Sequence, residues 1–144
     1  MHVPQVPDSS KIRFRTKLRT RWSDEDNQNV LNNAVYMTLL EEGRHAYFGK
    51  LGLLEANHFA FLLAQTNIRF LAPGRGGVEI EVELLTTHLG RTSFQQSYRI
   101  RESHGGRVWC EAEAVCVVYD AHSKDSAPLP VHFRAAIAEF EGLA

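Results

Sequence analysis

Hydrophobic and polar side chains alternate along residues 11–21, which is the pattern of a β-strand with one face in water. One face consists of Ile12, Phe14, Thr16, Leu18 and Thr20. The other face consists of Arg13, Arg15, Lys17, Arg19 and Arg21. Cations on a strand also discourage it from pairing with other chains. We therefore interpret the basic residues as a solvated strand face in preference to a phosphate-binding track.

A different period begins after the polar stretch WSDEDNQNVLNN, whose Asp and Asn residues are typical of a loop that leads into a helix cap. Apolar positions from Tyr36 to Leu51 recur every three or four residues, which predicts a helix over residues 34–51 that ends at Gly52. Gly43, in its middle, costs about 1 kcal/mol of helix propensity relative to alanine. We expect its missing side chain to allow close contact with a sheet.

Four further strands are predicted over residues 59–71, 78–87, 92–101 and 108–119, followed by a short helix over 131–141. The breaks APGRGG and Gly105-Gly106 are typical of tight turns, so the strands should form an antiparallel meander. The predicted fold class is α+β, an antiparallel sheet of five or more strands wrapped around one long central helix. Because one helix covers only part of such a sheet, we expect a second copy to cover the rest, in a homodimer or homotetramer.

The 144 residues suit one domain, which we place at residues 11–144 behind a flexible N-terminal arm, residues 1–10. A net charge of −1 gives no general attraction for nucleic acid or anionic lipid. No apolar run of about 18 residues is present to span a membrane, and the first ten residues lack the pattern of a secretory signal. Cys110 and Cys116 lie on one predicted strand, too far apart to bridge each other. We expect a cytoplasmic protein without membrane or nucleic-acid partners.

Several common catalytic motifs are missing from the sequence. It has no Gly-x-Ser-x-Gly nucleophile elbow, no P-loop, no Gly-x-Gly-x-x-Gly fingerprint and no His-Glu-x-x-His zinc pair. The seven histidines are scattered without the spacing of a metal site. We therefore expect no metal and no bound cofactor.

The unusual feature is a run of three carboxylates, Asp24, Glu25 and Asp26, just ahead of the predicted long helix. The first turn of a helix has unpaired N–H groups and a positive dipole, which can hold a developing oxyanion. A carboxylate beside such donors is what hydrolysis of an activated acyl group requires. The same carboxylates can instead cap the helix, and the residues by themselves leave both interpretations open.

The stretch RWSDEDNQNVLNNAVYMTLLEEGRHAYFGKLG resembles the hotdog-fold acyl-CoA thioesterases of the 4-hydroxybenzoyl-CoA thioesterase type. The signature of that family is an aromatic residue, Asp-x-Asp, a short loop and a helix that carries Asn and Tyr. The similarity continues through NIRFLAPGRGG, VEIEVELLTTHLGRTSF and VYDAHSKDSAPLPVHFRAAI. It implies a hotdog fold and a thioester hydrolase whose substrate is an acyl-CoA, with coenzyme A entering as part of the substrate between two subunits.

Matched position by position, the family's catalytic carboxylate is Asp26, which would act as nucleophile or as general base. The family's oxyanion donor is the backbone N–H at the helix start, which corresponds to Asn33. The resemblance also implies substrate-binding roles for Asn32 and Tyr36. The family's usual loop glycine is Asn29 here, a residue type that tolerates the left-handed conformation.

Two loop arginines are candidates for the phosphates of coenzyme A. Arg75 in APGRGG and Arg91 in LGRTSF offer several donors each, although each can equally be a solvated loop residue. Glu41 is a lesser candidate for the catalytic group, since a separate hotdog group uses a helix glutamate. A non-catalytic acyl-CoA binding module and a thioesterase for acyl carrier protein are alternatives on the same fold.

Overall fold

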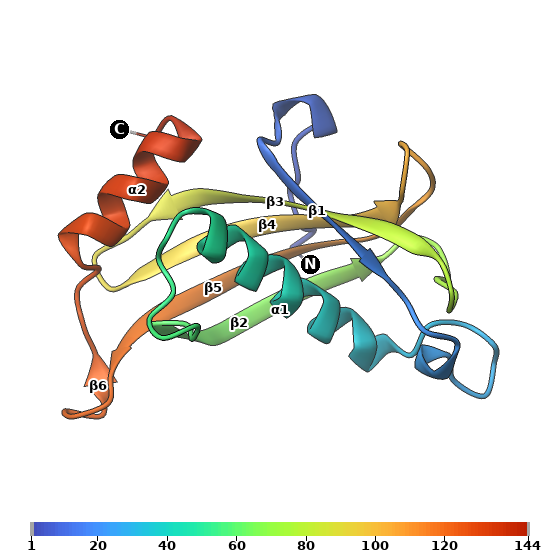
Figure 1. Cartoon of the computed structure of the whole chain (residues 1–144), viewed down its shortest axis with the longest axis horizontal. Helices are drawn as coiled ribbons and strands as arrows, with labels where there is room; N and C mark the ends of the chain where they lie inside the picture. Colours follow the sequence, from blue (N-terminus) through green and yellow to red (C-terminus); the bar gives the residue numbers. More distant parts are fainter. Residues whose placement is uncertain (1, 144) are drawn as a thin grey trace.

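A long helix lies along the concave face of a curled antiparallel sheet in the computed structural model, which describes residues 2–143 (Figure 1). The helix is α1 (Asn33–Lys50). The strands are β1 (Phe14–Arg19), β2 (Phe61–Phe70), β3 (Glu79–Leu89), β4 (Ser93–Glu102), β5 (Val108–Asp120) and the short β6 (Asp125–Ser126). A second helix, α2 (Val131–Glu141), and two 3-10 turns, η1 (Ser9–Lys11) and η2 (Trp22–Asp24), complete the described elements. The predicted fold class is confirmed.

The side of α1 that faces the sheet is apolar except for the buried Arg44, which donates to the Tyr98 hydroxyl on β4. The closest approach of the helix to the sheet is at Gly43. A Cβ atom built on Gly43 would lie 2.7 Å from Cγ1 of Val82 on β3. The backbone of α1 therefore sits directly on β3, as predicted from the glycine. Beside this contact, Tyr47 and Phe48 are fully buried and join an aromatic cluster with Phe61.

The strand order differs from the predicted meander. The order is β1-β3-β4-β5-β2, so β2 pairs with β5 and not with β3, although only residues 71–78 separate β2 from β3. Backbone hydrogen bonds explain the path of this connection. Its first residue, Leu71, donates to Trp109 on β5, while Gly77 at its other end donates to Thr20 beside β1. The connection therefore crosses the end of the sheet and is not a hairpin; β3, β4 and β5 alone form the meander.

The helix leaves the edge strand β2 partly uncovered. Leu63 and Phe70 face the same side as α1, because their register partners Cys116 and Cys110 are fully buried there. Leu63 is nevertheless 38% exposed and Phe70 46% exposed. Cys110 and Cys116 are both free thiols. The uncovered concave side of β2 is where the expected second copy would lie.

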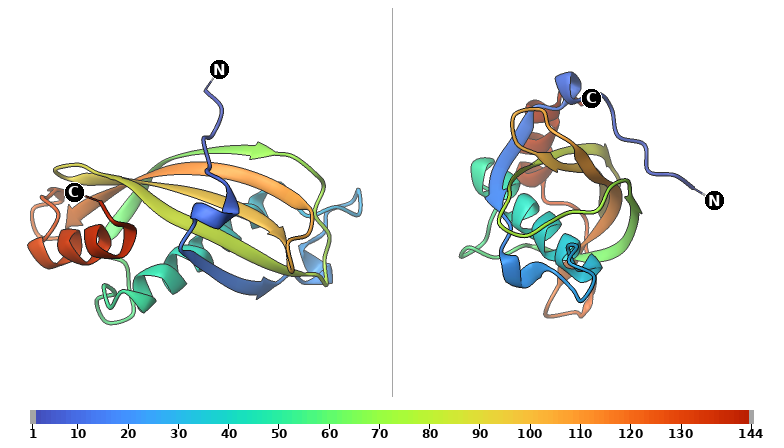
Figure 2. Two further views of the ribbon diagram at one scale, coloured as in Figure 1. Left: turned by 90° about the horizontal axis from the view of Figure 1, so that it is seen from above. Right: turned by 90° about the vertical axis from the view of Figure 1, so that its right-hand side faces the viewer.

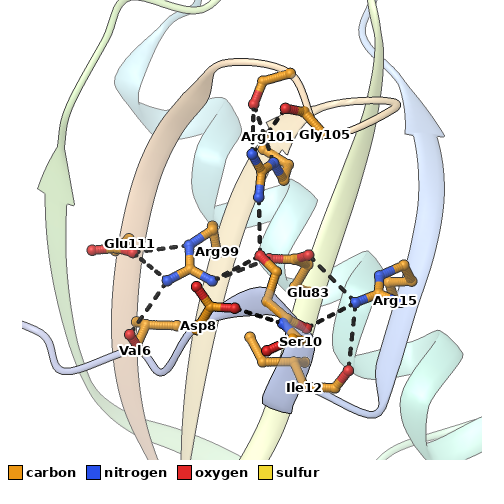
Figure 3. A network of polar contacts seen from close by, with 12 residues as sticks. Val6, Asp8, Ser10, Ile12, Arg15, Glu83, Arg99, Arg101, Gly105 and Glu111 are labelled. Carbon is orange, nitrogen blue, oxygen red and sulfur yellow. Dashed lines mark hydrogen bonds and ion pairs between the residues drawn. The ribbon is translucent and has the colours of Figure 1, made fainter.

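The convex face carries a row of alternating charge across the five long strands, of which Figure 3 shows the members from Arg15 to Glu111. From β1 to β2, the register neighbours are Arg15, Glu83, Arg99, Glu111 and Arg69. In its centre, Arg99 contacts Glu83 at 3.2 Å and Glu111 at 2.7 Å. Arg15 and Lys17 of β1 thus face Glu83 and Glu79 of β3, in agreement with the interpretation of these two cations as part of a strand face.

The N-terminal arm crosses the convex face from β3 toward β2 (Figure 2). Its hydrogen bonds with the sheet include one from Ser9 to Glu83, one from Arg99 to the Val6 carbonyl and one from Asn67 to the His2 carbonyl. The predicted flexibility of the arm stays a prediction. Within residues 2–143, no helix is both long and apolar enough to cross a membrane.

Candidate active site

The acidic loop between β1 and α1 is fixed at both ends by the connection that crosses the sheet. At its start, the Thr20 hydroxyl donates to the Arg75 carbonyl at 2.7 Å. At its end, the Leu31 amide donates to the Gly74 carbonyl at 2.8 Å. The loop is therefore held between the end of the sheet and the start of α1, and its three carboxylates take different positions.

Asp24 is the buried carboxylate, with 6% of its surface exposed. It accepts hydrogen bonds from the Arg21 backbone at 2.8 Å and from the Arg21 guanidinium at 2.8 Å. Glu25 points toward the crossing connection, where its carboxylate accepts from the Gly76 amide at 2.8 Å. Both residues therefore hold the loop together.

Asp26 lies in a turn of its own. Its Oδ1 accepts from the Gln28 amide at 2.7 Å, and its backbone N–H donates to the Val30 carbonyl at 2.8 Å. Asn29 completes the turn with a left-handed φ of 61°, as predicted for the residue that replaces the family's glycine. This turn orients one oxygen of Asp26 and, among the described residues, leaves Oδ2 without a hydrogen-bond partner.

Asn32 is the cap of α1. Its side-chain oxygen accepts from the Ala34 amide at 3.0 Å. The idea that the acidic run caps this helix is therefore wrong, since an asparagine performs that task and the carboxylate of Asp24 serves the short turn η2 instead. The predicted substrate-binding role of Asn32 stays a prediction beside this structural one.

Asn33 and Tyr36 lie on the same hollow, of about 310 Å³. It is bounded by the first turn of α1, the end of β2 and the crossing connection, through Val30, Leu31, Asn33, Tyr36, Phe70, Leu71, Ala72 and Pro73. The Tyr36 hydroxyl accepts from the Gly74 amide at 3.2 Å, and burial raises the pKa of this phenol. The Tyr36 and Phe70 rings meet edge to face at 5.0 Å. An aromatic and apolar hollow thus adjoins the predicted oxyanion donor.

The apolar end of β2 is the part of this hollow that the sequence analysis missed. Leu71 is 42% exposed although it follows a strand that packs in the sheet. The run Phe70-Leu71-Ala72-Pro73 is apolar right up to the proline, and its continuation through Ala72 and Pro73, beyond the predicted strand 59–71, was the available signal.

The structure separates the two arginines assigned to phosphate binding. Arg75 is exposed in the crossing connection, next to the acidic loop. Arg91 is in the turn between β3 and β4, at the other end of β3, which at 11 residues is roughly 35 Å long. Within one chain, only Arg75 lies near the acidic loop, so a role for Arg91 would require a second subunit.

Glu41 lies on α1 eight residues beyond Asn33, about 12 Å along the helix. It is exposed and borders a separate hollow of about 390 Å³ with His45 and Phe59. The described residues contain no group of three His, Cys, Asp or Glu side chains placed to hold a metal ion; the expected absence of a metal remains an expectation.

Comparison with known proteins identifies the family of the chain. Residues 20–137 match the model of the thioesterase-like superfamily. The chain belongs to this superfamily, and its curled sheet with one long helix is the hotdog fold of its structural neighbours. The predicted class, a thioester hydrolase, is thereby confirmed at the level of the family.

Three relatives illustrate the similarity. A thioesterase from Thermus thermophilus, crystallised with coenzyme A and zinc, is 28% identical, with a TM-score of 0.80 over 92% of this chain and 97% of the other. The 1,4-dihydroxy-2-naphthoyl-CoA hydrolase of Synechococcus elongatus is 25% identical over 76% of this chain and 84% of its own length. The chloroplastic acyl-acyl carrier protein thioesterase ATL2 of Arabidopsis thaliana is 28% identical over 66% of this chain. The match spans 57% of the length of this plant relative.

Proposed function

We propose that the chain hydrolyses coenzyme A thioesters at the acidic loop, with Asp26 as the catalytic carboxylate and the Asn33 N–H as the oxyanion donor. The observation that supports this choice is that the polar residues of the loop have different hydrogen-bond partners. Asp24 and Glu25 hold neighbouring segments, and Asn32 caps α1. Among the described residues, Oδ2 of Asp26 has no hydrogen-bond partner. The Asp26 amide donates to the carbonyl of Val30, which lines the hollow at the first turn of α1.

Either of two routes balances the reaction. With Asp26 as base, its carboxylate takes a proton from water while the water oxygen bonds to the carbonyl carbon; the C–S bond then breaks, and the thiolate of coenzyme A takes up the proton. With Asp26 as nucleophile, its oxygen displaces the thiolate and forms a mixed anhydride, which water hydrolyses. In both routes negative charge develops on the carbonyl oxygen, where an N–H donor stabilises it.

Aromatic acyl groups are the substrate class that we propose within this activity. The hollow beside Asn33 is lined by the rings of Tyr36 and Phe70, and the Synechococcus relative is named for an aromatic acyl-CoA. The finer assignment to the 4-hydroxybenzoyl-CoA type belongs to this proposal. A panel of 4-hydroxybenzoyl-, 1,4-dihydroxy-2-naphthoyl- and linear acyl-CoAs of matched size, compared by kcat/KM, tests it; a preference for the linear chains would contradict it.

The second candidate function is hydrolysis of acyl groups carried by acyl carrier protein in place of coenzyme A. The similarity to the Arabidopsis acyl-acyl carrier protein thioesterase favours it. The same acyl group offered on both carriers in one assay separates the two. We expect the coenzyme A thioester to be consumed first.

Asp26→Asn tests the catalytic assignment, because the amide keeps an oxygen for the Gln28 N–H and so preserves the turn. The amide is neither a base nor a good nucleophile. We expect kcat, measured as thiol release, to fall by about a hundredfold or more. Asp120→Asn is a matched control, since Asp120 accepts from the amide two residues on, that of His122, in the same kind of turn.

Equal kcat in wild type and Asp26→Asn would refute the role of Asp26. Tight binding of acyl-CoA by wild type in calorimetry, with no thiol released from any member of the panel, would instead support the non-catalytic binding module.

A further inference from the structure

Trp22 is the most exposed aromatic side chain among the large hydrophobic residues of the described structure, with 82% of its surface in contact with solvent. The second tryptophan, Trp109, is fully buried in the core. An indole exposes a large apolar area to water, so an exposed tryptophan on a fixed segment indicates a contact surface. Trp22 begins the turn η2, four residues before Asp26.

The segment that carries Trp22 is held rigidly. A Cβ atom built on Gly76 would lie 2.4 Å from the Arg21 carbonyl oxygen and 2.5 Å from the Trp22 Cα. Only glycine allows the crossing connection to come so close, and this contact supports the backbone under the indole. The buried Asp24 holds the same turn from the other side through Arg21.

A hollow of about 510 Å³ lies beside the indole, lined by Arg19, Thr20, Arg21, Trp22, Ser23 and Gly77. Its size is within the usual range for small-molecule sites. The Arg19 guanidinium uses Nη2 to donate to the Gly77 carbonyl at 3.0 Å, which fixes it at the hollow and leaves further donors. Arg21 is largely neutralised by Asp24, whereas the exposed Arg75 follows in the adjoining connection.

We infer that this hollow binds the nucleotide end of the substrate, with the adenine base stacked on Trp22 and its phosphates on Arg19 and Arg75. This inference rests on the proposed function, because coenzyme A brings an adenine nucleotide to the site. An indole face stacks on a purine, and an arginine fork matches phosphate oxygens. The hollow is at most about 14 Å of chain from Asp26, so the same loop carries the nucleotide contact and the catalytic carboxylate.

Binding of adenosine 3′,5′-bisphosphate tests the site without any thioester. We expect saturable quenching of tryptophan fluorescence, since Trp22 is exposed while Trp109 is shielded, and we expect no quenching in Trp22→Phe. In calorimetry, Trp22→Ala should weaken binding roughly tenfold or more. Arg19→Gln should weaken it as well, whereas Arg107→Gln, a change at an exposed arginine of the β4–β5 turn, should not.

Kinetics give the second readout. In Trp22→Ala, KM for an acyl-CoA should rise about tenfold with kcat within about twofold, while both constants for the corresponding acyl-pantetheine stay unchanged. Equal changes for the two substrates, or non-saturable quenching, would overturn the site. A Trp22→Ala variant that changes the oligomer mass but not nucleotide affinity would overturn it too. Nucleotide binding without hydrolysis would refute the proposed function and leave the site standing.

Discussion

Asp24 keeps a negative charge in an almost fully buried position because Arg21 lies beside it. Burial by itself raises the pKa of the Asp24 carboxyl. The hydrogen bonds from the Arg21 side chain and backbone, together with the Arg21 charge, outweigh burial and hold that pKa below its usual value. A carboxyl whose pKa is lowered by folding stabilises the folded state above its unfolded pKa, and this stabilisation is lost as the pH falls through the folded pKa.

Asp24→Asn should therefore flatten the acid side of the stability profile. Near pH 7 the free energy of unfolding should drop by about 1 kcal/mol, because the amide oxygen still accepts from the Arg21 backbone but without a charge. From about pH 5 downward, wild type should lose stability more steeply than the variant. Urea unfolding between pH 3 and 7 measures both; Asp125→Asn, an exposed carboxylate, is the control, and parallel profiles for wild type and Asp24→Asn would contradict the argument.

At the scale of single residues, the sequence predicts a conformation where that conformation depends on neighbours in the chain. Asn29 is left-handed, as expected from the chemistry of its turn. The burial of Asp24 was not predictable, since it depends on how the loop folds onto Arg21 and the crossing connection. The structure alone shows that Asp24 and Glu25 are hydrogen-bonded to neighbouring segments. It thereby singles out Asp26 as the carboxylate of the run with an oxygen that has no partner among the described residues.

At the scale of elements, Gly43 sets the distance between α1 and the sheet. Alanine at this position would gain about 1 kcal/mol of helix propensity. The new Cβ would lie 2.7 Å from Cγ1 of Val82, and overpacking of this kind costs about 1–3 kcal/mol. We therefore expect Gly43→Ala to lower the free energy of unfolding by about 1 kcal/mol.

Gly49→Ala is the matched control on the same helix. Its Cβ would meet Leu54 at 3.6 Å, an ordinary contact, so this variant should gain about 0.5–1 kcal/mol. Urea unfolding of both variants measures the difference. Removing Val82 methyl groups with Val82→Ala should reduce the penalty of Gly43→Ala in a double-mutant cycle; additive effects would show that the contact is not tight.

The existence of α1 and of the long strands follows from periodicity, because each element's own residues carry the pattern. The pairing of β2 does not. A short break rich in glycine predicts a hairpin, and only the hydrogen bonds of Leu71 with β5 and of Gly77 beside β1 reveal a connection that crosses the sheet. That crossing places Gly74 against the residues that lead into α1. Because the predicted hairpin does not bring these segments together, the sequence analysis did not predict this side of the site.

At the scale of the whole molecule, the two faces of the sheet differ in how they are covered by the rest of the chain. On the convex face, Arg99 forms ion pairs with Glu83 and Glu111 and donates to the Val6 carbonyl of the arm (Figure 3). The concave side of β2 has no such cover in the described chain, and the apolar Leu63 and Phe70 are exposed along it. A strand edge with exposed apolar side chains is a ready site for pairing with another chain.

We expect two copies to associate along β2, which would close the hollow beside Asn33 with residues of both. Leu63→Glu should shift the oligomer to monomers in sedimentation velocity, because it places a charge in the apolar contact, and kcat/KM should fall with the loss of the shared wall. Val131→Glu is the control, since Val131 is 85% exposed at the start of α2, away from β2. A monomeric wild type at micromolar concentration, or an unchanged mass for Leu63→Glu, would place the interface elsewhere and leave the hollow to be completed within one chain.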